Sequence, residues 1–238
     1  MRLGFQFRPI PFIVTLVLCA LGISLAQWQT RRAEQKLALQ ASLQMRRAEP
    51  AIRLDAGAIL PVEQLEYRRV RLRGSFLPDW PIYLDNRPRD GVAGFYLLMP
   101  FRIAASNLHV LVMRGWFPRN GQDRTRMPEI ATPQGTIEIE GIVRRDAGHV
   151  MQLGALDPPK PNAIVQNLDV QSFAHDSGLQ APPFVVEQTS ELRDGLRRDW
   201  PAPAVDVERH RAYAFQWYAL AAMALVFFIV TGFRRGTR

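Results

Sequence analysis

The sequence predicts an α+β membrane protein in which two transmembrane helices flank a mainly-β domain, either a small barrel or a sandwich-like sheet. Two apolar stretches without a charged residue lie near the ends of the 238-residue chain, at 10–26 and 213–233. Each is close to the roughly 20 residues that a helix needs to cross a bilayer. Between them, short stretches rich in β-branched and aromatic residues alternate with turns that contain Pro and Gly, which is typical of a compact β domain.

This pattern divides the chain into seven segments. The predicted segments are an N-terminal tail at 1–9, a first transmembrane helix at 10–28, a helical extension or linker at 29–50, a mainly-β domain at 51–192, a linker at 193–212, a second transmembrane helix at 213–233 and a C-terminal tail at 234–238.

The first apolar stretch has two interpretations. A basic start, an apolar core and the run Ser24-Leu25-Ala26 resemble a cleaved signal peptide. We favour an uncleaved membrane anchor, because the apolar run is longer than most signal cores and Trp28 follows where interfacial aromatic residues lie. Residues 27–47 contain no Gly or Pro, so the helix is expected to continue beyond the span and to end before Pro50.

The central region predicts short strands and one helix. Apolar and polar residues alternate in the first and fifth strands, whereas the third and fourth are apolar on both faces, as in strands covered on both sides. The predicted strands are 66–76, 82–84, 95–101, 108–117, 136–143, 150–153 and 184–187. The predicted helix is 169–178. Residues 114–116, Arg-Gly-Trp, are candidates for a functional role, but a bulge with a packed tryptophan explains them about as well.

The charge distribution predicts contact with membrane lipid and an orientation. The net charge of +8 is spread along the chain and flanks the apolar stretches, which favours lipid headgroups and not nucleic acid as the partner. Both tails carry arginine and no acid, so the termini are expected in the cytoplasm and the β domain outside it. No Arg- and Ser-rich leader precedes Ile10, from which we expect a bacterial inner membrane with the domain in the periplasm.

The start of the second span carries the most suggestive side chains. His210, Tyr213, Ala214, Trp217 and Tyr218 follow the i, i+3, i+4, i+7, i+8 spacing of one helix face. A histidine among aromatic residues at a membrane surface can bind a flat metal cofactor, but the same residues also suit a plain aromatic belt. The single cysteine, Cys19, allows no intramolecular disulfide, and the sequence lacks nucleotide-loop, HExxH and serine-elbow motifs, so no enzyme is expected.

Ordered motifs along nearly the whole chain resemble one family. They are Leu25-Ala26-Gln27-Trp28-Gln29-Thr30-Arg31-Arg32, the stretch 67–76, Gly94-Phe95-Tyr96 with Pro100-Phe101, the stretch 111–118, the stretch 135–144, and His210 with the aromatic residues after it. Together they resemble the Surfeit locus protein 1 family, assembly factors for cytochrome c oxidase. The chain departs from the family pattern at Ala26, Gln35, Met113, Glu208, Arg209 and Gln216, and keeps the histidine.

The resemblance implies a two-span protein that acts during maturation of oxidase subunit I and holds haem a, with subunit I and haem a synthase as partners. We then expect His210 as an axial ligand of the haem iron, with Trp28, Trp217 and Tyr213 around the ring. Arg32, Arg209 and Arg211 are the candidates for the propionates, since guanidinium groups pair with carboxylates. The alternatives are a membrane-tethered scaffold that binds protein partners without haem, and a soluble domain released by signal cleavage.

Overall fold

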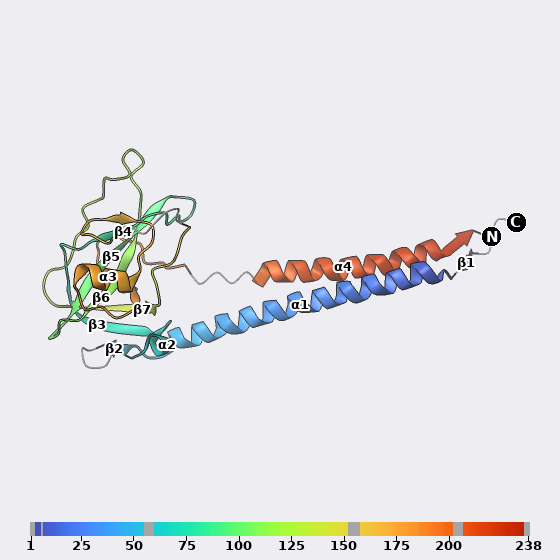
Figure 1. The fold of residues 1–238 in the computed structure, drawn as a ribbon, viewed down its shortest axis with the longest axis horizontal. Helices are drawn as coiled ribbons and strands as arrows, with labels where there is room; N and C mark the ends of the chain where they lie inside the picture. The colour runs from blue at the N-terminus through green and yellow to red at the C-terminus, as the bar shows by residue number, and fades with distance from the viewer. Residues whose placement is uncertain (1–2, 6, 55–59, 152–157, 202–206, 236–238) are drawn as a thin grey trace. The chain divides into compact units, whose positions relative to one another are not determined.

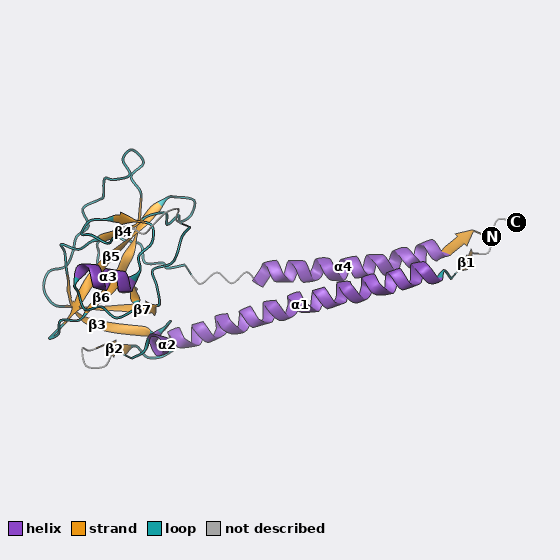
Figure 2. Cartoon of the chain, viewed as in Figure 1, coloured by secondary structure: helices purple, strands orange, loops and turns teal. Residues whose placement is uncertain are grey.

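The computed structural model describes residues 3–5, 7–54, 60–151, 158–201 and 207–235. The chain forms two compact units, one of helices, from Met1–Leu43 and Ala202–Arg238, and one dominated by strands, from Gln44–Pro201. Figure 2 shows this division into helical and strand-rich parts.

Two long helices make up the helical unit. They are α1 (Pro9–Ala48) and α4 (Val207–Gly232), and both are long and apolar enough to cross a membrane. The last turn of α1, from Gln44, belongs to the strand unit. As predicted, α1 continues beyond the apolar stretch without a break and ends two residues before Pro50. Short strands β1 (Leu3–Phe5) and β10 (Phe233–Arg235), which the sequence did not predict, pair antiparallel.

Small residues line the face along which α1 and α4 pack. Gly22, Ala26 and Ala33 are buried on α1, and Ala214 and Ala221 are buried on α4. A Cβ atom added at Gly22 would lie 3.0 Å from Cβ of Ala221 and 3.1 Å from the carbonyl oxygen of Trp217. The two backbones therefore approach closely, as small residues allow in membrane helices. The buried residues are four and seven positions apart on α1 and seven apart on α4, which is the spacing of a coiled-coil seam.

The seam is antiparallel (Figure 1). Towards the N-terminus of α1, the ring of Phe12 lies 5.7 Å from that of Phe228 near the end of α4. Further along, the Sγ of Cys19 donates a hydrogen bond of 3.3 Å to the carbonyl oxygen of Ala221. Contacts thus move backward along α4 as they move forward along α1.

A closed five-stranded barrel forms the strand unit. The strands are β3 (Arg69–Phe76), β5 (Gly94–Ile103), β6 (His109–Pro118), β7 (Ile137–Arg144) and β9 (Val185–Gln188). The pairing runs β3–β7–β9–β6–β5, and β5 pairs with the end of β3 to close the ring. Only β6–β9 is parallel within this ring. The barrel, and not the sandwich, is therefore the fold.

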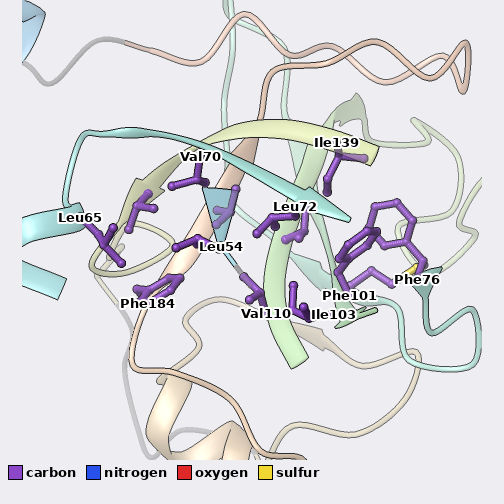
Figure 3. Close-up of a cluster of buried hydrophobic side chains, with 14 residues drawn as sticks. Leu54, Leu65, Val70, Leu72, Phe76, Phe101, Ile103, Val110, Ile139 and Phe184 are labelled. Carbon is purple, nitrogen blue, oxygen red and sulfur yellow. The ribbon is translucent and has the colours of Figure 1, made fainter. Parts of the chain in front are cut away.

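The inward-facing residues of these strands fill the barrel (Figure 3). Alternate positions of β3, such as Val70 and Leu72, are completely buried, while the arginines between them face outward. Phe76 and Phe101 meet edge to face, with ring centroids 4.9 Å apart. Leu54 of the short strand β2 (Ile52–Leu54) and Leu65 of helix α2 (Val62–Leu65) belong to the same cluster. The alternation of apolar and polar residues in the sequence thus arises because every second side chain faces the barrel interior.

A second layer covers one outer face of the barrel. It consists of β4 (Ile82–Leu84), β8 (Ile164–Val165) and α3 (Val170–Ser177), which bury a separate apolar cluster against β5, β6 and β9. This layer explains why β5 and β6 are apolar on both faces. Helix α3 confirms the predicted helix at 169–178: Asp169 caps it by accepting from the amide of Ser172, and Gly178 ends it in the left-handed conformation.

Two strand predictions need correction. The first strand begins at Arg69 and not at 66, because α2 and a left-handed Tyr67 come before it. The strand predicted at 150–153 is wrong for Val150 and Met151, while 152–153 lie outside the described residues. The side chain of Asn167 donates to the carbonyl oxygen of Val150 and accepts from its amide, both at 2.8 Å, and so occupies the groups that a strand neighbour would use.

The predicted linker at 193–212 is also wrong at both ends. The amide and carbonyl of Trp116 in β6 exchange hydrogen bonds of 2.8 Å with those of Arg197, so this segment belongs to the strand unit. Helix α4 begins at Val207, six residues before the predicted span. Pro, Asp and Arg suggested a solvated linker, but the side chains of Asp194 and Arg198 are buried. The basic residues before Tyr213 extend the helix.

The structure contains a bulge at 114–116, and the bulge places Arg114 in a buried cluster with Asp194 and Arg198. Leu97 and Leu98 face Gly115 and Met113, so Arg114 is the extra residue of β6. The side chain of Arg114 is fully buried, bonds Thr132 and the carbonyl of Ala131, and lies 4.8 Å above the ring of Phe76.

Candidate cofactor site between the two helices

The histidine singled out in the sequence lies in the second turn of α4 and contacts the other long helix. Its Nδ1 is 2.7 Å from Oε1 of Gln29 in α1, and the hydrogen bond joins residues 181 positions apart in the chain. Both side chains are half-buried. This is a direct polar contact between α1 and α4, made one residue after the first predicted span and three residues before the second.

The packing seam brings these two residues together. Gln29 lies three residues after Ala26 and four before Ala33, so it shares the buried face of α1. His210 lies four residues before Ala214 and seven before Trp217, and so shares the face of α4 that meets α1. The close approach of small residues along the helices therefore sets the distance between the two polar side chains.

The contact assigns roles to the two ring nitrogens. The amide oxygen of Gln29 can only accept, so this contact is a hydrogen bond in the tautomer in which Nδ1 of His210 carries the proton and donates. In that tautomer Nε2 keeps its lone pair. Metal-binding histidines commonly have this arrangement, with one nitrogen held by a hydrogen bond and the other available as the ligand. The site therefore satisfies one chemical requirement for binding iron through Nε2.

The predicted aromatic residues take different positions around this contact. Trp217 is half-buried on the seam, with its backbone oxygen facing Gly22. Trp28 is 46% exposed, and the guanidinium of Arg32 lies over its ring at 5.8 Å. Tyr213, one turn after His210 in α4, is also 46% exposed. The structure thus groups His210 with Trp217 and Gln29, and it pairs Trp28 with Arg32 on the same helix.

The basic residues beside the histidine are exposed. Arg211 forms an ion pair of 3.0 Å with Glu208 one turn earlier in the helix. Arg209 is exposed next to His210. Arg32 also donates to Oε1 of Gln35 at 3.4 Å. These exposed side chains place positive charge beside the His210–Gln29 pair.

Next to the His210–Gln29 contact, an apolar groove of about 580 Å³ runs along α1 and α4. Trp217 and Leu25 lie at the end nearer His210, because each is within two turns of the His210–Gln29 pair. The groove is lined by Leu18, Leu21, Gly22, Leu25, Trp217, Leu220, Met223, Ala224 and Phe227. It offers an apolar surface beside the polar site.

The other histidines do not form a site with these residues. His109 is buried in β6, and His149 and His175 are exposed in the same strand-rich unit. Throughout the described part of the chain, no three His, Cys, Asp or Glu side chains gather as a metal-binding group.

The sequence places Trp28-Gln29 in a possible two-helix site with the start of the second span, but it does not predict a contact between Gln29 and His210. The signal for this contact is the spacing of Gly22, Ala26, Gln29 and Ala33, which places one polar residue in a row of small ones. A lone amide at such a position is expected to have a partner in the neighbouring helix. The matching spacing of His210, Ala214, Trp217 and Ala221 identifies that partner.

Comparison with known proteins gives one consistent family. The model of the SURF1 family matches residues 16–222. A SURF1-like protein of Rickettsia felis is 28% identical over 226 residues, covering 92% of this chain and 95% of the relative. One of Rickettsia bellii is 30% identical, covering 91% and 86%. Surfeit locus protein 1 of Rattus norvegicus is 26% identical, covering 87% and 71%. The matched region includes the whole barrel, most of α1 and the first part of α4.

Proposed function

The chain belongs to the SURF1 family, and from this membership we propose that it acts in the assembly of cytochrome c oxidase by holding haem a for delivery to subunit I. The observation that carries the haem part of this proposal is the 2.7 Å contact between His210 Nδ1 and Gln29. It supports Nε2 of His210 as the ligand of the haem iron.

The surroundings of the contact suit the rest of haem a. Its two propionates are carboxylates, and Arg32, which lies over the ring of Trp28, and Arg209 and Arg211, which flank His210, are the candidate partners. Its isoprenoid tail is apolar, and the groove that begins at Trp217 and Leu25 offers an apolar surface for it. Trp28, Tyr213 and Trp217 supply aromatic surface for the ring. A single side-chain ligand fits a carrier that must release its cargo.

The proposed location follows from the helices and the charges. Both helices cross the bacterial inner membrane, the arginine-containing tails lie in the cytoplasm and the barrel lies in the periplasm. The His210–Gln29 pair is then at the outer membrane surface. Subunit I receives the haem, haem a synthase supplies it, and the barrel provides the protein-binding surface. No catalytic step is assigned to the chain.

Absorption spectroscopy tests this proposal. The detergent-solubilised protein, purified after co-expression with a source of haem a, is expected to show a haem a spectrum, and His210→Ala is expected to lose it while still inserting into the membrane. Phe215→Ala is the matched control and is expected to keep haem, because Phe215 is 73% exposed on α4. Unchanged haem content in His210→Ala would overturn the haem part of the proposal.

A second measurement tests the assembly role by itself. Deletion of the gene is expected to lower oxidase activity and the haem a content of subunit I. If deletion lowers oxidase activity while the wild-type protein binds no haem, the scaffold alternative is the correct one. Normal oxidase activity after deletion would overturn the assembly role.

A further inference from the structure

The hydrogen bond between the helices has a consequence for the histidine that extends the proposed function, on which it rests. We propose that Gln29 is a positioning residue: it fixes the tautomer and ring orientation of His210 so that Nε2 faces the cofactor. Gln29 itself does not touch the iron. Its effect passes through the Nδ1–Oε1 contact of 2.7 Å.

The packing around Gln29 restricts where its side chain can go. Ala26 and Ala33, one turn to either side on the same face, are exposed by 0% and 3%. On the facing helix, Ala214 is buried one turn after His210. The amide therefore lies between tightly packed turns, and the imidazole is the polar partner that the structure gives it. A ring held this way loses little rotational freedom when it binds a ligand.

The choice of an amide over a carboxylate also has a chemical effect. A carboxylate bonded to Nδ1–H pulls the proton more strongly and makes Nε2 a stronger donor to the metal. An amide oxygen orients the ring with less of this effect. The same site with Gln29 should therefore hold iron more weakly and with a higher reduction potential than it would with glutamate, which suits a carrier that releases its cargo.

The simplest competing role for Gln29 is to join the two helices without affecting the ligand. Polar side chains often do this in membrane helix pairs. In that case a methionine of similar length would alter stability alone. The tautomer of His210, the reduction potential of bound haem and the response to glutamate would not change with residue 29.

The first experiment uses the apo protein, so it does not depend on haem binding. The full-length chain, labelled with ¹⁵N-histidine and reconstituted in lipid, is compared with Gln29→Met and Gln27→Met; Gln27 is an exposed neighbour and serves as the matched control. His210→Ala identifies the His210 signals. The wild type and Gln27→Met are expected to show a protonated Nδ1 and an unprotonated Nε2. Gln29→Met is expected to shift the population toward a protonated Nε2.

The second experiment uses the haem-loaded protein. Gln29→Met is expected to lower haem affinity about ten-fold or more, the range seen when such supporting groups are removed. Gln29→Glu is expected to restore binding and to lower the reduction potential below that of the wild type. The proposal is overturned if Gln29→Met keeps the wild-type tautomer and affinity, or if Gln29→Glu binds no better than Gln29→Met.

The outcomes separate this inference from the proposed function. If His210→Ala retains haem, the proposed ligand is wrong, whatever the tautomer of the apo protein is. If His210→Ala loses haem but Gln29→Met does not, the ligand stands and the positioning role of Gln29 is refuted.

Discussion

The carboxylate of Asp194 lies 2.8 Å from the guanidinium of Arg114, and neither side chain is more than 1% exposed. Arg198 forms a second ion pair with the same carboxylate, at 2.6 Å, and is itself 2% exposed. Arg114 is the extra residue of the bulge in β6, while Asp194 and Arg198 follow the last barrel strand. One acid between two arginines thus ties the segment after the barrel to the barrel wall.

Loss of the Asp194 charge should destabilise the strand unit. Asp194→Asn leaves two buried guanidinium groups without their shared anion, and breaking a buried pair in this way costs about 3–5 kcal/mol. Chemical unfolding of the full-length protein in detergent, followed by tryptophan fluorescence, measures this cost. The exposed partner of Arg198, Glu191, gives the control: Glu191→Gln should change stability by less than about 1 kcal/mol. Equal effects of the two substitutions would contradict the assignment.

The same carboxylate should give the fold a dependence on acid pH. Burial acts to raise the pKa of Asp194, but hydrogen bonds and charge pairing with Arg198, then Arg114, outweigh burial and hold that pKa below its usual value. A depressed pKa stabilises the fold above the unfolded-state value of about 3.9, and this stability is lost as pH falls through the lower folded-state value. The melting temperatures of wild type and Asp194→Asn should therefore converge below about pH 4. A constant difference would count against this coupling.

Closure of the barrel should depend on the absence of a side chain at Gly74. This residue faces Ile103 of β5, and an added Cβ would overlap the backbone carbonyl oxygen of Arg102. Gly74→Val is expected to force β3 and β5 apart and to cost about 3 kcal/mol or more in unfolding free energy. Gly121→Ala, where an added Cβ would meet open space, should be close to neutral. Native stability in Gly74→Val would show that this pairing does not close the barrel.

The seam between the helices should control the cofactor site. In Gly22→Leu, the new side chain meets Ala221 and the backbone of Trp217, so the helices separate and the His210–Gln29 bond weakens. Haem content should fall, and the ¹⁵N spectrum of the apo protein should resemble that of Gln29→Met. Ser24→Leu places the same bulk on the exposed face of α1 and should leave both measurements unchanged. Identical behaviour of the two variants would argue that the seam does not set the site.

Local pattern was enough to place most elements of the strand unit. Strand 82–84 was predicted to the residue, and β5, β6, β7 and β9 within one or two residues, because alternation or continuous apolar character marks them. Strands β2 and β8 were missed, since two or three residues carry too little periodicity. The choice between barrel and sandwich depended on the pairing of Gly74 with Ile103, which is a long-range contact that no local pattern encodes.

The site was predictable only in part for the same reason. Helical spacing identified His210 and the aromatic residues near it. Gln29 gained meaning only when the register between the two helices was known, since its partner is far away in the sequence. The buried cluster at Arg114 was hidden for a different reason: Asp and Arg near Pro suggest solvent, and only the barrel wall against them makes those charges buried partners.

The position of β9 in the barrel constrains the order in which the protein folds during synthesis. This strand lies between β6 and β7 in the ring, yet it is the last barrel strand to leave the ribosome. The barrel therefore stays open until Gln188 has been synthesised. Until then, the edges of β6 and β7 that pair with β9 remain unpaired. Helix α4 starts only nineteen residues later, at Val207. Completion of the barrel and insertion of the second helix thus fall close together in time, so the polar pair between the helices is assembled last.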